Sequence, residues 1–367
     1  MVSPVSYHNF RLESNFESQL AGDQFRTILC LEESYRVPLI HCQSPIGEGG
    51  RHPYGEWRRK ICQWSFKVID HFKIDREVVS TAMNIFDRYL IMGSKSYDMD
   101  TCPCPECQRR VDSRTFQLAA MASLYLAMKI SDSAEDHSSC NRKLRLQSFV
   151  ELSRGQFRAE DITAMERVIL EELRWKIHPP TPMTAVSYLL RLMPSYVSLP
   201  IGCRNSYDLV LHVLHELSRY LTELSVCLGS VCMSYTPCQV AYASILLSME
   251  LLTPAALPLE VRNAFNEAVV STSSFAGGTI LTPNDEAIGS LQAHLRHSFW
   301  PEMLMDDCDN AEVGHPISMA KDFGLLDVSC IMSKAPAVSP VANYYSQQQF
   351  YKNDLEDSPV CVSRQLS

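Results

Sequence analysis

The chain has 367 residues, of which 46% are hydrophobic and 20% are charged, and its formal net charge is −9. This length exceeds that of an ordinary single domain, so two domains with flexible ends are expected. The acidic balance argues against nucleic-acid and anionic-membrane partners, because both need a concentrated basic surface. The most apolar stretch, Leu118–Met128, is much shorter than the roughly 20 residues that span a bilayer.

The cysteines and residues 1–16 indicate the cellular compartment of the protein. Fourteen cysteines are spread along the chain, and residues 1–16 lack the order of basic, apolar and small residues that marks a signal peptide. Reduced thiols are therefore expected, many of them buried as small apolar side chains. The predicted location is the nucleus and the cytoplasm.

In the first half of the chain, apolar residues recur at three- or four-residue steps, the spacing of one helical face. The predicted helices are Trp57–Phe72, Val79–Leu90, Phe116–Met128, Leu144–Leu152 and Ala159–Leu173. The third is apolar nearly all round, which predicts a central helix surrounded by the others. Prolines at 179, 180 and 182 end the pattern, so residues 55–180 are predicted to form one five-helix unit.

A second helical run follows. Its predicted helices are Met183–Met193, Ser206–Leu228, Pro237–Leu252, Glu260–Val270 and Asp285–Phe299. Ala122–Met128 and Ala243–Met249 resemble each other and both lie in a third helix, which indicates an internal repeat. The prediction is an all-α fold with five-helix units at 55–180 and 181–300, an N-terminal regulatory segment at 1–54 and a disordered tail at 301–367.

Two charged residues stand out from the apolar pattern. Glu166 interrupts a stripe formed by Ile162, Ile169 and Leu170, so it is either a buried acceptor within the fold or part of a partner site. Lys129 follows the central apolar helix, where the helix dipole alone favours a cation. Spacing in the sequence does not join the two, and both interpretations stay open.

Several short motifs, taken together, resemble the cyclin box, most closely that of the D-type (G1) cyclins. Trp57–Trp64 reads WRRKICQW and Ala82–Leu90 reads AMNIFDRYL, like the signatures of the family's first two helices. Arg219–Ser225 resembles part of the C-terminal cyclin repeat. Hallmark positions match at Arg58, Asp87, Leu118, Lys129 and Glu166. The resemblance implies two tandem cyclin folds with flexible tails.

The resemblance also implies a function and a set of contact residues. The chain would be a non-catalytic regulatory subunit that binds and activates a cyclin-dependent kinase, with a role at G1/S. Arg58 and Asp87 would form a structural pair. The implied kinase-binding residues are Lys129, Glu166, Leu126, Ile130, Leu170, Trp175 and Ile177. No phosphate-binding glycine loop or paired nucleophile and base in the sequence suggests an enzyme.

The first predicted helix retains part of the family's substrate-docking patch, at Trp57, Ile61 and Trp64. Lys60 replaces an apolar residue of that patch and Lys67 an acidic one. Docking of Arg-x-Leu substrates is therefore expected to be weakened.

A segment near the N-terminus resembles the Leu-x-Cys-x-Glu motif with which D-type cyclins bind retinoblastoma-like pocket proteins. Its residues are Ile28, Cys30 and Glu32. In an extended peptide, alternation would place all three on one side, where they could enter adjacent pockets. The alternative is a short helix packed on the first repeat.

The segment between Ser94 and Asp112 contains Cys102, Cys104 and Cys107. Three close thiols could bind zinc, but structural zinc needs four ligands, and the candidates for the fourth, Cys140 and His137, are distant in sequence. A zinc site and an ordinary flexible insertion both stay open. No other cofactor is predicted.

Two competing functions are a cyclin-fold factor acting in transcription and a kinase-independent scaffold. The first predicts a basic repeat and an N-terminal zinc ribbon, neither of which the sequence has. The second predicts loss of the kinase-facing Lys129 and Glu166, and both are present. The predicted partner is therefore a cyclin-dependent kinase, with a pocket protein as a possible second partner.

Overall fold

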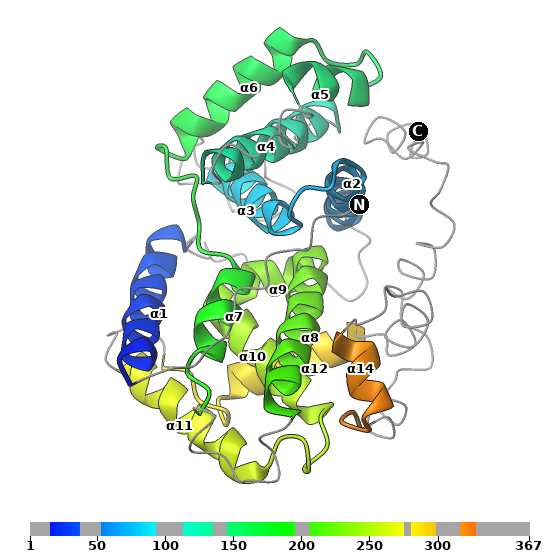
Figure 1. Cartoon of the computed structure of the whole chain (residues 1–367). Coiled ribbons are helices and arrows are strands. Elements are labelled where there is room, and N and C mark those ends of the chain that lie inside the picture. Colours follow the sequence, from blue (N-terminus) through cyan, green and yellow to red (C-terminus); the bar gives the residue numbers. More distant parts are fainter. Residues whose placement is uncertain are drawn as a thin grey trace. The chain divides into compact units, whose positions relative to one another are not determined.

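The structure is a computed structural model that describes residues 15–36, 53–92, 113–134, 145–194, 206–274, 280–298 and 316–327. These residues are helical apart from turns and short connections (Figure 1), and they contain no β-strand, only an isolated bridge between Leu252 and Leu326. The predicted all-α fold class is confirmed. No helix in this part of the chain combines the length and the apolar character needed to cross a membrane.

The chain divides into two compact units. The N-unit comprises residues 34–181 and 223–236, and the C-unit comprises residues 1–33, 182–222 and 237–348; residues 349–367 are assigned with the N-unit but lie outside the described residues. Each unit is described by itself below.

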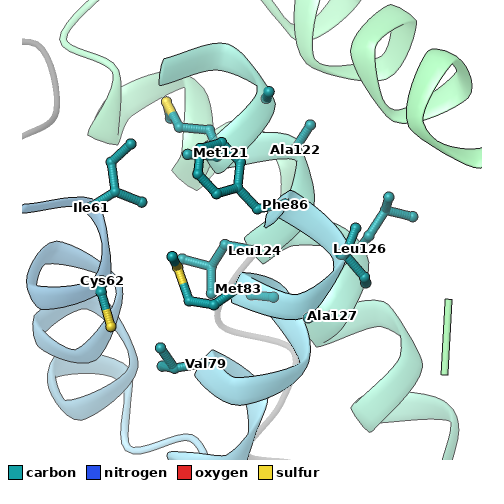
Figure 2. Close-up of a cluster of buried hydrophobic side chains, with 14 of the residues drawn as sticks. Ile61, Cys62, Val79, Met83, Phe86, Met121, Ala122, Leu124, Leu126 and Ala127 are labelled. Atoms are coloured by element: carbon teal, nitrogen blue, oxygen red, sulfur yellow. The ribbon is translucent and has the colours of Figure 1, made fainter. Parts of the chain in front are cut away.

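The N-unit is built around one buried helix. Its main helices are α2 (Pro53–Phe72), α3 (Glu77–Met92), α4 (Ser113–Ala134), α5 (Leu146–Leu152) and α6 (Ala159–Glu172). The middle of α4 is buried on nearly every side, as its all-round apolar sequence predicts. Figure 2 shows side chains of α2, α3 and α4 meeting in the core, among them Ile61, Met83 and Leu124.

Local signals set the turn between α2 and α3. Lys73 adopts a left-handed backbone conformation with φ 55°, and the amide of Ile74 donates to the carbonyl of Ile69 at 3.0 Å, which ends α2. The carboxylate of Asp75 accepts the amide of Glu77 at 2.8 Å and so caps the start of α3. The turn therefore brings α2 and α3 together as a helical hairpin.

The C-unit repeats this plan around α10. Its helices include α7 (Pro182–Leu190), α8 (Tyr207–Cys227), α10 (Pro237–Glu250), α11 (Leu259–Ser274) and α12 (Glu286–Ser298). The last turn of α8 and the short helix α9 (Gly229–Ser234) belong to the N-unit. Most residues of α10 are buried, and Arg262 of α11 donates to the carbonyls of Met249 and Leu252 at 2.7 and 3.0 Å. These bonds satisfy carbonyls that a helix end leaves without a helical partner.

Two helices lie in the segments predicted to form the N-terminal regulatory region and the disordered tail. Helix α1 (Asn15–Tyr35) buries Phe25, Ile28 and Leu29, within the segment predicted to be regulatory. Helix α14 (Pro316–Asp322) lies in the tail predicted to be disordered. That prediction is wrong for residues 316–327.

The ordered part of the tail is held by its backbone. The amide of Thr253 donates to the carbonyl of Leu325 at 2.9 Å, and the amide of Asp327 donates to the carbonyl of Leu251 at 2.8 Å. Ala320 is completely buried. Pairing with residues far away in the sequence thus orders a segment whose own composition gives no helical period.

Candidate partner-binding site

An ion pair joins the two charged residues that the sequence could not connect. Nζ of Lys129, near the end of α4, donates to Oε1 of Glu166 in the middle of α6. The Lys129 side chain is 49% exposed and that of Glu166 is 12% exposed. The ammonium group also lies 5.1 Å from the centroid of the Tyr125 ring. The cation thus stays accessible to solvent beside a mostly covered carboxylate.

The predicted apolar contacts differ in how far they are exposed. Leu126 is buried in the core of the N-unit, so it supports the surface rather than forming it. Ile130, Leu170 and Ile177 are partly exposed and pack against that core. Trp175 is 71% exposed, an unusual state for so large an apolar ring. This region therefore offers an apolar surface as well as charge.

The end of α6 determines how Trp175 is displayed. Arg174 and Trp175 both have positive φ angles, of 51° and 62°. The amide of Trp175 donates to the carbonyl of Leu170 at 2.9 Å, a bond that closes the helix end. The chain therefore turns sharply after Glu172 and leaves the indole facing solvent.

A second ion pair lies inside the N-unit. Nε of Arg58 donates to Oδ1 of Asp87 at 2.9 Å, and Nη2 donates to Oδ2 at 2.7 Å. Nη1 donates to the carbonyl of Val226 at 2.9 Å. Burial alone would lower the pKa of Arg58, but the charge of Asp87, its hydrogen bonds with Arg58 and the nearby Cys232 and Cys62 together outweigh burial and raise that pKa. Arg58 is 1% exposed, so the pair lies inside the fold, where it can stabilise the N-unit but cannot contact a partner.

A side chain at position 229 would crowd Arg58. A Cβ atom at Gly229 would lie 3.3 Å from Cδ of Arg58, which is closer than an ordinary contact. Cys62 and Cys227 are also buried here, with their sulfur atoms 3.5 Å apart. Glycine at 229 therefore lets α9 approach the buried arginine.

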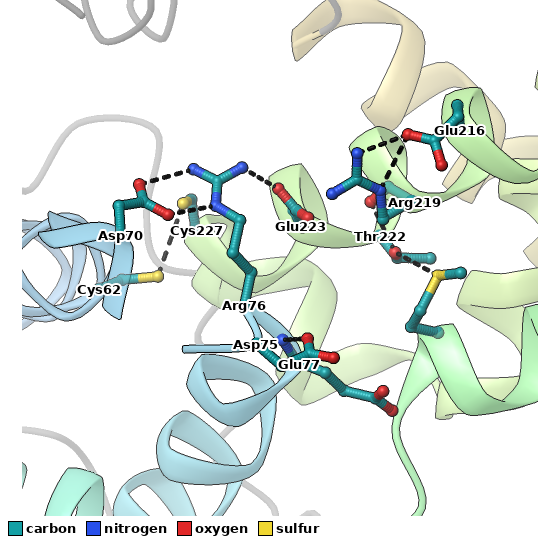
Figure 3. A network of polar contacts seen from close by, with 11 residues as sticks. Cys62, Asp70, Asp75, Arg76, Glu77, Glu216, Arg219, Thr222, Glu223 and Cys227 are labelled. Carbon is teal, nitrogen blue, oxygen red and sulfur yellow. Dashed lines mark hydrogen bonds and ion pairs between the residues drawn. The ribbon is translucent and has the colours of Figure 1, made fainter. Parts of the chain in front are cut away.

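The sequence analysis missed a second arginine that forms ion pairs in the N-unit, Arg76. Its guanidinium donates to Asp70 at 2.9 Å and also to Glu223, as Figure 3 shows. It lies over the Phe66 ring, 5.0 Å from the centroid. Glu223 is 147 residues away in the sequence, so no local pattern could reveal this contact.

The predicted substrate-docking patch is largely covered. Ile61 and Trp64 are each only 4% exposed and belong to the core of the N-unit. Trp57 is partly exposed, and its ring meets that of Phe116 edge-on at 5.5 Å. An open apolar surface formed by all three residues is therefore not present in the described structure.

The segment that resembles the pocket-protein motif is helical, so the extended arrangement is wrong. Within α1, Ile28 and Glu32 are buried while Cys30 is exposed. Oε2 of Glu32 accepts the amide of Cys238 at 2.9 Å, where the start of α10 favours a negative charge. The helical alternative is correct about secondary structure, but this contact lies in the C-unit rather than on the first repeat.

The candidate zinc ligands Cys102, Cys104 and Cys107 lie outside the described residues. Within the described ranges, no three His, Cys, Asp or Glu residues are grouped so that they could hold a metal ion. The zinc site stays a prediction, to be checked by metal analysis of protein purified without chelator. Less than about a tenth of an equivalent of zinc would rule out a stoichiometric site.

Comparison with known proteins shows which family the chain resembles. Residues 43–178 match the family model described as "Cyclin, N-terminal domain". The chain is similar to cyclins over this range. All the predicted kinase-binding residues lie within the matched range, as do Arg58 and Asp87. The resemblance to the cyclin box that the short motifs indicate is thus confirmed.

Among similar proteins is Cyclin-D3-2 of Arabidopsis thaliana, which is 27% identical over 198 residues, or 54% of this chain and 45% of that protein. G1/S-specific cyclin-E1 of Gallus gallus is 24% identical over 169 residues, or 46% of this chain and 33% of that protein. G2/mitotic-specific cyclin-B2 of Mesocricetus auratus is 25% identical over 234 residues, or 64% of this chain and 48% of that protein. The chain thus spans less than half of the length of each of these relatives.

A solved structure also aligns with this chain. It is a chain of the CAK complex of Chaetomium thermophilum bound to ATP-gamma-S, with a TM-score of 0.43 and 13% sequence identity. The alignment covers 99% of this chain and 94% of that chain. At this TM-score the similarity supports no conclusion about fold or function.

Proposed function

We propose that this chain is a cyclin, a non-catalytic regulatory subunit that binds and activates a cyclin-dependent kinase. The observation that carries the proposal is the Lys129–Glu166 pair, which lies at the family's hallmark positions and has a half-exposed lysine beside a mostly covered carboxylate. Large exposed apolar residues beside charged groups are typical of protein interfaces, and Trp175 supplies such a residue. The proposed contact surface consists of Lys129, Glu166, Ile130, Leu170, Trp175 and Ile177.

The ion pair need not break for a partner to bind. An ammonium group has three donors and a carboxylate can accept about four hydrogen bonds, so the contact between Lys129 and Glu166 leaves capacity on both groups. A kinase could place backbone carbonyls near Lys129 and backbone amides near Glu166. Burying these bonds in the complex would strengthen them, because water would no longer compete.

The proposed mechanism is conformational. Protein kinases need a Glu on a mobile helix to pair with the Lys that positions ATP before phosphoryl transfer can proceed. A rigid surface that packs against that helix shifts the kinase toward this arrangement. The central helix α4 and its buried neighbours give this cyclin such a rigid base. The chemistry itself would remain with the kinase.

The proposed stage is G1/S, with action in the nucleus and the cytoplasm. The resemblance to D-type cyclins and the similarity to a protein named G1/S-specific cyclin-E1 support this stage. A G2/mitotic-specific cyclin-B2 is similar over a longer region, so timing needs its own experiment. The abundance of the protein and its associated kinase activity should both be followed through a synchronised cell cycle.

A pocket-protein partner would require a rearrangement of α1. Glu32 would have to leave the amide of Cys238, and buried Ile28 would have to become accessible. A peptide spanning Phe25–Tyr35 tests this part of the proposal without the helix contacts. Absence of binding to a retinoblastoma-like protein at high micromolar concentration would remove the pocket protein from the proposal.

The decisive experiment is affinity purification of the full chain from cells, with mass spectrometry of the bound proteins. We expect a cyclin-dependent kinase in near-stoichiometric amount, and we expect the recombinant cyclin to raise that kinase's activity. Recovery of transcription complexes without a kinase, or of a kinase that the cyclin does not activate, would contradict the proposal.

A further inference from the structure

The turn that displays Trp175 is intrinsically unfavourable. Neither Arg174 nor Trp175 is a glycine, yet both have left-handed backbone angles, which crowd the Cβ atom of an L-residue. Three backbone hydrogen bonds hold the turn, with donors at Trp175, Lys176 and Ile177. Two adjacent residues of this kind persist only where surrounding structure fixes them.

Arg88 of α3 supplies that support from outside the turn. Its Nη1 donates to the carbonyl of Lys176 at 2.7 Å, one residue beyond Trp175. Its guanidinium also lies 4.9 Å from the centroid of the Tyr35 ring. Among the described residues no carboxylate forms an ion pair with Arg88, and the neighbouring Asp87 pairs with Arg58.

This arrangement differs from an ordinary buried ion pair. Arg88 is 5% exposed, and burial lowers its pKa, so placing a cation here is costly. An apolar side chain of similar length could fill the space without that cost. It could not donate a hydrogen bond to the carbonyl that follows the left-handed turn.

We propose that Arg88 is a positioning residue for kinase binding, which fixes the direction of Trp175 by anchoring the carbonyl of Lys176. The inference rests on the proposed function, because it takes Trp175 as a contact for a cyclin-dependent kinase. Arg88 itself, being buried, does not touch the partner.

The test is a double-mutant cycle with the kinase recovered by co-purification. Arg88→Met should weaken kinase binding about tenfold in the otherwise unchanged chain and should have little further effect in Trp175→Ala. Arg88→Lys, which keeps a donor, should retain most of the affinity. Equal losses in both backgrounds, or no loss in either, would overturn the proposal.

Hydrogen exchange of the free protein provides a readout that a merely structural role would not give. Arg88→Met should speed exchange at the amides of Trp175, Lys176 and Ile177 more than elsewhere in the N-unit. The matched control is Arg76→Met, which removes another partly buried arginine of this unit and should leave exchange at the turn unchanged. Uniformly faster exchange throughout the unit in Arg88→Met would assign Arg88 to general stability instead.

The outcomes separate this inference from the proposed function. If Arg88→Met does not fold, Arg88→Gln takes its place in both measurements, and it should show the same loss of binding and the same faster exchange at the turn. If Trp175→Ala binds as tightly as the unchanged chain, the positioning role is overturned, while Lys129 and Glu166 still decide the proposed function. If no kinase binds at all, the proposed function fails. Hydrogen exchange at the amides of the turn then decides by itself whether Arg88 fixes the conformation of the turn.

Discussion

Two ion pairs of the N-unit use similar residue types in opposite settings. Arg58 and Asp87 have side chains that are 2% and 10% exposed. Arg58 donates three hydrogen bonds to Asp87 and a further one to the carbonyl of Val226. Lys129 and Glu166 have side chains that are 49% and 12% exposed. The first pair is enclosed by the fold, whereas the second presents its cation to solvent.

The difference separates a contribution to folding from a contribution to binding. A buried charge that loses its partner is left uncompensated, which is strongly destabilising. An exposed pair adds little to folding, because water and ions screen it. The same exposed pair can become costly to remove once a partner covers it. The exposure of the side chains therefore predicts which pair stabilises the fold and which pair contributes to binding a partner protein.

The strongest test of this comparison is Arg58→Ala. It would strand the buried Asp87 carboxylate and the carbonyl of Val226, so we expect a loss of about 3–5 kcal/mol in the free energy of unfolding. Urea unfolding of the free protein measures it, with Arg59→Ala on the same helix as the control. Equal stability of the two variants would mean that Asp87 finds another partner or reaches water.

The next effect should appear in binding rather than folding. Lys129→Ala and Glu166→Ala should each weaken kinase binding by about 2–5 kcal/mol, or roughly thirty- to several-thousand-fold. Their free energies of unfolding should change less than that of Arg58→Ala, because the Lys129 side chain is 49% exposed and water screens the pair. Isothermal titration with the kinase and urea unfolding give the two quantities. If either variant unfolds as readily as Arg58→Ala, its residue belongs to the fold rather than to the contact surface.

The sequence predicted the helical repeats well because their periodicity is local. The observed α2, α3, α4 and α6 closely match predicted segments, and the all-round apolar character of α4 is matched by burial nearly all round. Helix α1 had a usable signal, since Phe25, Ile28, Leu29 and Glu32 share a helical face. The motif interpretation of the same residues favoured an extended peptide instead.

Long-range contacts could not be predicted in this way. The bonds from Arg58 to Val226 and from Arg88 to Lys176 join residues 168 and 88 positions apart. Nothing in the local pattern around Arg88 distinguishes it from a surface arginine. Exposure was equally hidden, since Ile61 and Trp64 matched a surface patch by motif and yet are buried.

A third pair, in the C-unit, sharpens the comparison through pH. Burial alone would raise the pKa of Glu216, but hydrogen bonds from His215 and Arg219 and the charge of Arg219 outweigh it and lower the pKa from 4.5 to about 2. Figure 3 shows Arg219 beside this carboxylate. Because the folded-state pKa is the lower one, the stabilisation is present above about pH 4.5 and is lost as the pH falls toward 2.

The expected size of this effect is modest. The shift corresponds to at most about 3 kcal/mol, and the 43% exposure of the Arg219 side chain lowers this to about 1–2 kcal/mol. Glu216→Gln should therefore flatten the loss of stability between about pH 4.5 and 2, measured by urea unfolding at several pH values. Glu267→Gln, at an exposed position of α11, is the control. An unchanged slope in Glu216→Gln would mean that screening removes the interaction.

The smallest effect concerns the position in the C-unit that corresponds to Lys129. Glu250 follows the repeated segment Ala243–Met249 as Lys129 follows Ala122–Met128, and it accepts two bonds from Nη2 of Arg296, at 2.9 and 2.7 Å. Both side chains are about one-third exposed, at 32% and 33%. We expect Glu250→Ala to cost only about 0.2–1 kcal/mol in the free energy of unfolding.

Glu250→Ala is also a matched control for Lys129→Ala in measurements of kinase binding. Glu250→Ala removes a charged group at the end of a central helix, as Lys129→Ala does, but in the other unit and with the opposite sign. If only the N-unit carries the contact surface, Glu250→Ala should leave kinase affinity unchanged while Lys129→Ala lowers it. A similar loss in both variants would show that partial exposure of an ion pair is not enough to identify the contact surface, and that both units contribute to binding.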